Sequence, residues 1–267
     1  MEFVITDDQN LHKAKEELVV VIDVLRAFTT ACYAINSNPE DYIVVDDLDL
    51  AYRLKKENPE YILMGERDGF NLPGFDYGNS PMEIKDVNFS HKTIVHTTTL
   101  GTRGIINALN HTKDVITGSF VNAKAIINYI KKENPNIIYL FCTNGTSDDN
   151  EDMMLAKYIK SYCENKPLSM DVIKKNLIKH KSGIMYLINP RTKYSKKDFF
   201  LALELDKFNF MIKAHLGTDK LIHLKKNLIN QVPHDQLTPS WRSRLSDCCN
   251  LFISCHLSRI SPIYRMS

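Results

Sequence analysis

Hydrophobic and polar residues alternate along the chain with two different periods. Short apolar runs rich in β-branched residues predict strands at 18–22, 42–45, 61–64, 93–98, 115–119 and 137–142. Segments with apolar residues at every third or fourth position predict helices at 27–35, 48–57, 102–110, 123–132 and 151–163. Because strands and helices alternate, we expect a three-layer α/β fold, with a mostly parallel sheet and helices on both of its faces.

The pattern becomes more helical beyond Pro167. It predicts helices at 170–179 and 196–205, with one short apolar run at 220–224. We therefore expect the C-terminal part of the domain to contain more helix than the part before it.

The last part of the chain differs in composition and charge. From about Thr238 onward, Ser, Cys and Arg replace the Lys, Asn and Ile of the preceding sequence. The net charge of the whole chain is +2, and residues 240–267 contribute +3 through four arginines and one acid, so the preceding residues sum to −1. We expect an α/β domain at 1–238 and a basic, Cys- and Ser-rich tail at 239–267 that is poorly ordered. A short helix docked on the domain or on another subunit is the alternative interpretation of this tail.

The charge distribution also bears on partners. Because the body of the chain has no basic field, we do not expect a nucleic-acid partner. A rival hypothesis makes the tail a protein or nucleic-acid interaction module, whose binding would weaken with salt and disappear when residues 240–267 are deleted. The first eighteen residues are too charged for the apolar region of a signal peptide. No apolar run approaches the roughly 18 residues of a membrane span. We expect a cytoplasmic protein with no membrane partner, and a homo-oligomer is compatible with the sequence.

Polar residues follow four of the predicted strands. Asp23 and Arg26 follow the first strand, and the pair Glu-Arg at 66–67 follows the third. The fourth strand leads into TTTLGTR at 97–103, and the sixth leads into TNGTSDDNED at 143–152. Ligands of open parallel sheets bind beyond the carboxyl ends of the strands, so these residues are expected at one rim. Their mixture of carboxylates, arginines and hydroxyl-rich turns suits a divalent cation beside an anionic ligand.

Each of these features also has a purely structural interpretation. Asp23 could cap the following helix, and Arg26 could pair with it. The TTTLGTRG segment could be a strand end and a helix start, whose N–H groups need partners in any case. In the functional interpretation, these N–H groups, the hydroxyls of Thr99 and Thr102, and Arg103 hold an oxyanion at the positive end of the helix. The joint placement of the motifs favours the functional interpretation.

Familiar phosphate-binding signatures are absent from the sequence. There is neither a G-x-x-x-x-G-K-[ST] loop nor a G-x-G-x-x-G turn. Leu25 stands two residues after Asp23, which excludes the paired aspartates of haloacid-dehalogenase phosphatases. Asp148 stands six residues after Cys142 in place of the arginine that a cysteine-phosphatase loop requires.

The stretch GERDGFNLPGFDYGNSPMEI at 65–84 is too irregular for a helix or a strand. Loops of this length are usually functional or disordered, and the aromatic residues in it argue against disorder. Glycines would let its backbone approach a small ligand, at positions Gly65, Gly69, Gly74 and Gly78. We expect this loop to clamp the anionic groups of a ligand.

Five motifs together resemble those of a known enzyme family. They are VVVIDVLRAFTT, GERDGFNLPGFDYGNSP, TTTLGTRG, NGTSDDNEDMMLAKYI and DFFLALELDKFNF, in order between about Val19 and Pro233. This set is similar to the 2-phosphosulfolactate phosphatase family of coenzyme M biosynthesis. The resemblance implies Mg²⁺-dependent hydrolysis of 2-phosphosulfolactate to sulfolactate and phosphate, on a three-layer α/β fold.

The resemblance also implies roles for individual residues. Residues with catalytic roles would be Asp23, Arg26, Arg67 and Arg103. Residues that bind the substrate would be Glu66, Asn79, Ser80, Thr98, Thr99, Gly101 and Thr102. Metal ligands would come from Asp23, Asp76, Glu151 and Asp152. Carboxylate ligands favour Mg²⁺ over zinc, since no histidine lies in these motifs.

The chain departs from the resembled pattern at two places. Leu100 stands where the pattern has Asn, and the resemblance ends near Pro233. In the expected mechanism the metal polarises the phosphoryl group and organises a water, while arginines neutralise the equatorial oxygens. Attack by water directly and attack by an aspartate first are both open. A non-catalytic phosphate or sulfonate binder, silenced by Leu100, is the alternative function.

Overall fold

The structure, a computed structural model, describes residues 1–146, 148–188 and 194–228. Within them, ten strands form one sheet: β1 (Glu2–Thr6), β2 (Leu18–Ile22), β3 (Asp41–Val44), β4 (Ile62–Arg67), β5 (Phe70–Asn71), β6 (Thr93–Thr97), β7 (Val115–Gly118), β8 (Ile137–Cys142), β9 (Phe210–Leu216) and β10 (Ile222–Leu228). The α-helices of the same residues are α1 (Ala27–Asn36), α2 (Leu48–Glu57), α3 (Pro81–Ile84), α4 (Gly101–Leu109), α5 (Ala123–Glu133), α6 (Glu151–Cys163), α7 (Met170–Lys179), α8 (Lys181–Ile188) and α9 (Lys196–Ala202).

The sheet consists of two parallel groups of strands with an antiparallel hairpin between them, and the short strand β5 pairs antiparallel with β4 at one edge. The strand order is β1-β8-β2-β7-β9-β10-β3-β6-β4-β5. The first group, β1, β8, β2 and β7, is parallel throughout, and so is the second group, β3, β6 and β4. The hairpin strands β9 and β10 pair antiparallel with each other and with β7 and β3. The predicted α/β fold is confirmed, with the difference that the sheet is mixed.

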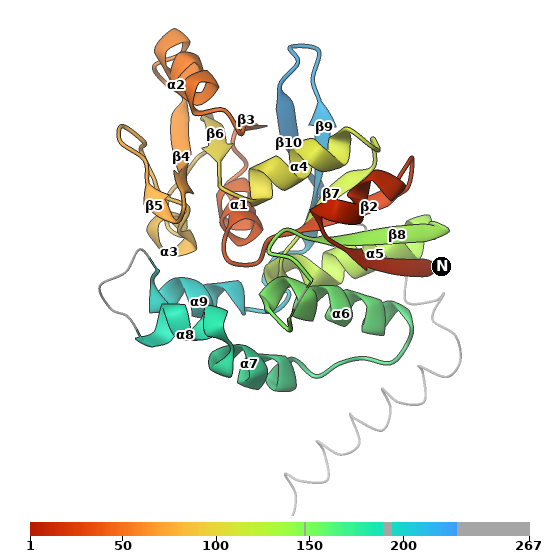
Figure 1. The fold of residues 1–267 in the computed structure, drawn as a ribbon. Helices are drawn as coiled ribbons and strands as arrows, with labels where there is room; N and C mark the ends of the chain where they lie inside the picture. Colours follow the sequence, from red (N-terminus) through yellow and green to blue (C-terminus); the bar gives the residue numbers. More distant parts are fainter. Residues whose placement is uncertain (147, 189–193, 229–267) are drawn as a thin grey trace, which may run out of the picture. The chain divides into compact units, whose positions relative to one another are not determined.

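The hairpin sets the relative direction of the two groups. Three successive antiparallel pairings separate β7 from β3, so the second group runs opposite to the first along the sheet. In Figure 1, β4 stands upright whereas β2 and β8 run across the view, so the sheet twists strongly between the groups. Residues that follow β2 and residues at the end of β4 nevertheless line one cavity.

Helices cover both faces of the sheet, as the sequence predicts. On one face of β2, Val19 belongs to a buried cluster with Ile105 of α4. On the other face, Val20 belongs to a second cluster with Ile126 of α5 and Leu155 of α6. Every residue of β2 is buried, which explains why its sequence is a continuous apolar run without polar alternation. The result is a three-layer arrangement.

Most of the predicted strands and helices lie at closely similar bounds in the structure. The strands β1, β5 and β9 and the helices α3 and α8 were not predicted, and β5 and α3 lie in the stretch 65–84 that was expected to be irregular. The sequence of β9 contains Lys213 and His215 within an otherwise apolar run, because this strand is only partly buried near its end. The apolar run expected at 220–224 lies in β10, whose strand continues to Leu228.

Helices and strands both occur beyond Pro167. The helices α7, α8 and α9 are followed by the β9–β10 hairpin. The predicted domain boundary at 238 and the predicted tail at 239–267 lie outside the described residues. No helix in the described part of the chain combines the length and the hydrophobicity of a membrane span.

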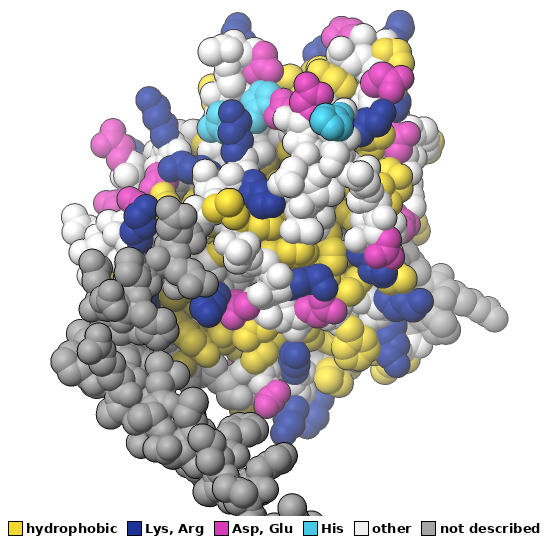
Figure 2. Space-filling model, turned by 180° about the vertical axis from the view of Figure 1, so that it is seen from behind, with side chains coloured by type: hydrophobic (Ala, Val, Ile, Leu, Met, Phe, Trp, Pro, Cys, Tyr) yellow, Lys and Arg dark blue, Asp and Glu magenta, His cyan; other side chains and the backbone are white. Residues whose placement is uncertain are grey.

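Charged side chains of both signs are interspersed on the face shown in Figure 2. Histidine side chains gather beside acidic ones at one end of this face. His223 of β10 contacts the carboxylates of Asp41 and Asp219 at 2.8 and 3.1 Å. Burial alone would lower the pKa of His223, but hydrogen bonds to these two carboxylates outweigh that effect and raise it. This contact links β10 to β3, at the place where the hairpin joins the second group.

Candidate active site

Two adjoining cavities share part of their lining. Both are lined by Asp23, Leu25, Leu100, Tyr186 and Tyr194. The first, here named the loop cavity, has a volume of about 330 Å³ and is also lined by Arg26, Glu66, Asp68, Gly69, Asn79 and Thr99. The second, here named the carboxylate cavity, has a volume of about 270 Å³ and is also lined by Thr143, Asn144, Glu151, Asp152, Lys181, Ser182 and Met185.

Asp23 lies between the two cavities, directly after β2. Its Oδ1 accepts a hydrogen bond from the N–H of Ala27 at 3.0 Å, so it satisfies a donor at the start of α1. Burial raises the pKa of the Asp23 carboxyl to about 7, although the Ala27 N–H opposes the rise. The nearby carboxylates of Glu66 and Glu151 raise this pKa further, and Arg26 lowers it. Both sequence interpretations of Asp23 therefore hold, because it bonds a helix start and also lines the cavities.

The close approach of α4 to Asp23 explains Gly101. A Cβ atom at this position would lie 2.7 Å from Oδ2 of Asp23 and 2.5 Å from the Cβ of Ala27. Any larger residue would push α4 away from the start of α1. Gly101 thus allows α4 to lie close to Asp23 and to the start of α1.

Glu151 and Asp152 form the first turn of α6, where the positive end of the helix favours carboxylates. Oδ1 of Asp152 accepts from the N–H of Val24 at 2.9 Å, and Oδ2 accepts from the N–H of Asn144 at 3.1 Å. These bonds fix the start of α6 against the segment that carries Asp23. Burial, followed by the charges of Glu151 and Asp23, raises the pKa of Asp152 well above its usual value.

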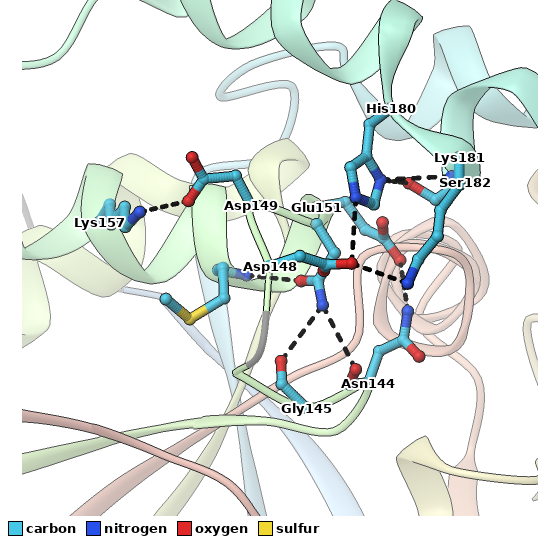
Figure 3. Close-up of polar contacts among 11 residues, drawn as sticks. Asn144, Gly145, Asp148, Asp149, Glu151, Lys157, His180, Lys181 and Ser182 are labelled. Carbon is cyan, nitrogen blue, oxygen red and sulfur yellow. Dashed lines mark hydrogen bonds and ion pairs between the residues drawn. The ribbon is translucent and has the colours of Figure 1, made fainter.

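Glu151 has an unsatisfied oxygen. Its Oε1 accepts from the Asn144 side-chain amide at 3.4 Å, whereas its buried Oε2 has no hydrogen-bond partner among the described residues (Figure 3). A buried carboxylate oxygen without a partner is unfavourable unless a ligand or ion satisfies it. The side chain is 3% exposed.

The crowded carboxylates are suited to a divalent cation. No set of three or more His, Cys, Asp or Glu side chains within the described residues is arranged as a metal site by itself. Mg²⁺ usually takes only one or two carboxylates and keeps several waters, so it does not require such a set. The unpaired Oε2 of Glu151 and the raised pKa of Asp23 both indicate negative charge that lacks compensation. The residues present therefore fit Mg²⁺.

Arg26 lines the loop cavity and pairs with a residue that the sequence analysis missed. Its Nη1 donates to Oδ2 of Asp198 at 2.8 Å, and both side chains are buried. Asp198 also accepts from the hydroxyl of Ser80 at 2.7 Å and from the N–H of Met82 at 3.0 Å. The predicted site residue Ser80 therefore helps to position Arg26 through Asp198. Asp198 begins the motif DFFLALELDKFNF, which is the signal that could have indicated it, although an acid in the first turn of a helix is also common without any such role.

Glu66 is an anchor for the loops around it. Its Oε1 accepts from the N–H of Thr99 at 2.7 Å, and its Oε2 accepts from the Thr99 hydroxyl at 3.0 Å and from the N–H of Gly69. The hydroxyl of Thr99 accepts in turn from the N–H of Asp68 at 2.8 Å. The acid and the hydroxyl that were expected to contact the substrate therefore bond mainly to each other.

Thr98 and Thr102 also satisfy each other. The Thr102 hydroxyl donates to the carbonyl of Thr98 at 2.9 Å and accepts from the N–H of Thr98 at 2.9 Å. The Thr98 hydroxyl accepts from the N–H of Thr102 at 3.0 Å. These bonds cap the start of α4, which supports the structural interpretation of the TTTLGTRG segment.

Besides Ser80, Thr98, Gly101 and Thr102, three further residues that were expected at the site line neither cavity. Arg67 donates from Nη1 to the carbonyl of Glu66 at 2.9 Å and from Nη2 to the Thr97 hydroxyl at 2.8 Å, and it also bonds the carbonyl of Asp46. Arg103 is exposed on α4. Asp76 accepts from Lys55 at 3.1 Å and from the N–H of Leu63 at 2.8 Å.

The irregular stretch at 65–84 folds into a tight β4–β5 hairpin, a connecting segment and α3. Gly65 has φ +148°, and a Cβ atom there would lie 1.9 Å from the carbonyl oxygen of Thr97, so the glycine serves the packing of β4 against β6. Asn79 does line the loop cavity, and its buried Oδ1 has no partner among the described residues. Glu66, Asp68 and Gly69 of the same stretch line this cavity too, and the ligand clamp stays a prediction.

Comparisons with known proteins agree on one family. A sequence model described as 2-phosphosulpholactate phosphatase matches residues 3–233. Curated relatives bear the name probable 2-phosphosulfolactate phosphatase. The protein of Bacillus subtilis (strain 168) is 37% identical over 153 residues, which cover 57% of this chain and 66% of the relative. That of Caldicellulosiruptor saccharolyticus is 38% identical over 170 residues, covering 61% and 68%. That of Clostridium tetani is 28% identical over 228 residues, covering 85% and 93%. The match to the Bacillus protein therefore spans just under two thirds of its length.

Proposed function

The chain belongs to the 2-phosphosulfolactate phosphatase family, and from this premise we propose that it hydrolyses 2-phosphosulfolactate to sulfolactate and inorganic phosphate. This is a reaction of coenzyme M biosynthesis. We propose Mg²⁺ as the cofactor. The observation that supports both proposals best is the carboxylate cavity, where Asp23, Glu151 and Asp152 lie close together and Oε2 of Glu151 has no partner among the described residues.

Asp23 and Glu151 would hold the metal ion, and Asp152 would keep them in place through its bonds to Val24 and Asn144. When bound, Mg²⁺ supplies charge neutralisation for the phosphoryl oxygens and activates a water molecule. We exclude Asp76 from the proposed ligands, because its carboxylate bonds Lys55 and lines neither the loop cavity nor the carboxylate cavity.

Arg26 would bind the phosphoryl group from the loop cavity. One of its five N–H donors bonds Asp198 within the described part of the chain, which leaves others for substrate oxygens. The guanidinium lies 6.0 Å from the ring centre of Tyr186 and 5.7 Å from that of Tyr194. These rings restrict the access of water to the cation and so strengthen its interaction with an anion. Its pair with Asp198 fixes the planar group in one orientation, which lysine could not reproduce.

The proposal is tested by phosphate release from 2-phosphosulfolactate with Mg²⁺ and with a chelator. We expect release with Mg²⁺, a loss of release with chelator, and recovery when Mg²⁺ is added back. Equal release with and without chelator would remove the metal from the proposal. No release under any metal condition would contradict the phosphatase function itself.

A second candidate function follows from Leu100. This apolar side chain lines both cavities next to Asp23, and at the N-cap position of α4 it makes no side-chain capping bond. If the Asn of the resembled pattern is needed for hydrolysis, the chain would bind the ester without cleaving it. Calorimetric binding of 2-phosphosulfolactate without phosphate release, together with hydrolysis by Leu100→Asn, would select this alternative.

A further inference from the structure

A lysine outside the motifs lines the carboxylate cavity. Lys181 is the first residue of α8, and it lines this cavity together with Asp23, Glu151 and Asp152. Its side chain is 73% exposed, so the ammonium group lies at the solvent edge of the cavity and not in its floor. Glu151 and Asn144 line the same cavity.

Lys181 pairs with a carboxylate of the loop that leads to Glu151. Its Nζ lies 2.7 Å from Oδ2 of Asp148, and the same oxygen lies 3.4 Å from Nε2 of His180 (Figure 3). Both members of this pair are partly exposed, so the pair contributes little net free energy. An anionic ligand could therefore replace Asp148 at Lys181 at small cost, and Asp148 would keep His180 as a neighbour.

The cations that line the two cavities are few. Of the described residues around them, only Arg26 and Lys181 carry a formal positive charge, because Arg67 and Arg103 lie elsewhere. Arg26 already shares its charge with Asp198. A substrate that carries phosphate, sulfonate and carboxylate groups needs more positive charge than Arg26 and one divalent ion supply, since the cavity walls are themselves acidic.

We propose that Lys181 binds the sulfonate or carboxylate group of the substrate at the edge of the carboxylate cavity, in exchange for its ion pair with Asp148. This inference rests on the proposed phosphatase function. The carboxylates that would hold the metal lie deeper, so the phosphoryl group would occupy the cavity floor, and the charged groups of the carbon skeleton would face the edge. The long, flexible stem of lysine lets its ammonium group move from Asp148 to such a ligand.

A structural role for Lys181 makes a different prediction. In that case the ion pair would only tie the loop of Asp148 to α8. Removal of either partner would then break the same contact and have the same effect. If Lys181 binds substrate, only its own removal weakens binding, because loss of Asp148 releases the ammonium group for the ligand.

The test compares Lys181→Met and Asp148→Asn with Lys179→Met, which removes an exposed charge from the end of α7 as a matched control. Kinetics of phosphate release are measured with 2-phosphosulfolactate and with ethyl phosphate, which has neither sulfonate nor carboxylate. For Lys181→Met we expect KM for 2-phosphosulfolactate to rise about tenfold or more, with kcat little changed. We expect no rise in KM for Asp148→Asn, and wild-type constants for Lys179→Met. With ethyl phosphate, all variants should match the wild type.

Three outcomes would overturn the inference. The first is an unchanged KM for 2-phosphosulfolactate in Lys181→Met, and the second is a rise of this KM in Asp148→Asn as large as in Lys181→Met. The third is a rise of KM for ethyl phosphate in Lys181→Met as large as that for 2-phosphosulfolactate. If the wild type releases no phosphate from either ester, the proposed function fails. Calorimetry then still tests the role of Lys181. If the wild type binds 2-phosphosulfolactate, we expect Lys181→Met to bind it about tenfold or more weakly. An unchanged dissociation constant, or no binding to the wild type, would overturn the inference there as well.

Discussion

Asp23 and Glu66 occupy comparable places in the two parallel groups of strands, and the difference between them is instructive. Asp23 follows β2 in the first group, and Glu66 lies near the end of β4 in the second. Both are buried, and both line the loop cavity. Glu66 accepts hydrogen bonds from Thr99 and Gly69 at both of its oxygens, whereas Asp23 accepts one, from Ala27, among the described residues. Both residues are acids at a strand end, so the sequence signal is the same. Glu66 is used to hold a loop, whereas the carboxylate of Asp23 has acceptor capacity that a cation could use.

The neighbours of the two acids extend this contrast. On the side of Asp23, burial and mutual repulsion raise the pKa values of Asp23 and Asp152, and Glu151 has an unpaired oxygen. On the side of Glu66, nearby donors come from the backbone and from hydroxyls. We infer that the first group forms the metal side of the site and the second group forms its supporting side.

The largest expected effect is that of Asp23→Asn. The substitution removes a proposed metal ligand with little change of shape, so we expect phosphate release to fall by at least about a hundredfold. Because the variant also removes a buried charge from a crowd of acids, its thermal midpoint should stay equal or rise. Activity assays and thermal unfolding check both expectations. Wild-type activity at saturating Mg²⁺ would exclude Asp23 as a ligand.

The pH dependence of Mg²⁺ binding sharpens the same contrast. The pKa of Asp23 is raised to about 7, so the carboxyl is protonated below this pH and must lose its proton to bind a cation. Affinity should therefore rise with pH up to about 7 and then level off, with roughly a tenfold change per pH unit below it. Calorimetry in two buffers of different ionisation enthalpy would detect the released protons. An affinity for Mg²⁺ that does not change with pH below about 7 would contradict the idea that the Asp23 carboxyl loses a proton when the ion binds.

Glu66→Gln should affect stability more than chemistry. Both carboxylate oxygens of Glu66 accept hydrogen bonds. Glutamine keeps one acceptor oxygen, but its NH₂ group would face N–H or O–H donors in place of the other oxygen. We expect the free energy of unfolding to fall by about 1–3 kcal/mol, with a smaller loss of activity than in Asp23→Asn. Urea denaturation measures the free energy of unfolding, and phosphate release measures the activity. A fully stable but inactive variant would show that Glu66 contacts the substrate.

The two arginines outside the cavities should differ from each other. Arg67→Lys loses the planar group that bonds Glu66, Asp46 and Thr97 together, so we expect a loss of about 1–2 kcal/mol in unfolding free energy. Arg103→Lys, on an exposed surface, should change stability by less than about 0.5 kcal/mol and leave kcat/KM unchanged. A tenfold fall in kcat/KM for Arg103→Lys would show that Arg103 contributes to the active site.

Periodicity predicted most of the fold because buried strands and amphipathic helices leave strong patterns. The run Leu18–Ile22 and the helical spacing of 123–132 are examples. It did not predict β9, where Lys213 and His215 interrupt the pattern, and so it could not show that an antiparallel hairpin separates two parallel groups. Residues that follow β2, β6 and β8 nevertheless line adjoining cavities with Glu66 of β4, whereas Arg67 and Arg103, which were expected at the same rim, line neither cavity.

The candidate site was predictable to the extent that it follows strand ends. Asp23, Glu66, Thr99, Glu151 and Asp152 do line the two cavities. The role of Asp198 depends on a contact with Arg26, far away in the sequence, and no local pattern records such a contact. Lys181 begins an unpredicted helix. Two of the three partners of Arg67 are backbone carbonyl oxygens, which any sequence supplies.

The β9–β10 hairpin also affects the order in which a nascent chain can assemble. Residues 210–228 provide the ladder that joins β7 to β3 in the described sheet, yet they emerge from the ribosome after every other strand of that sheet. Until then the edges of β7 and β3 present unpaired N–H and C=O groups, which can pair with other chains. The two groups cannot adopt their fixed mutual orientation before the hairpin inserts. We therefore expect ribosome-bound chains shorter than this point to need chaperone protection and to bind no substrate.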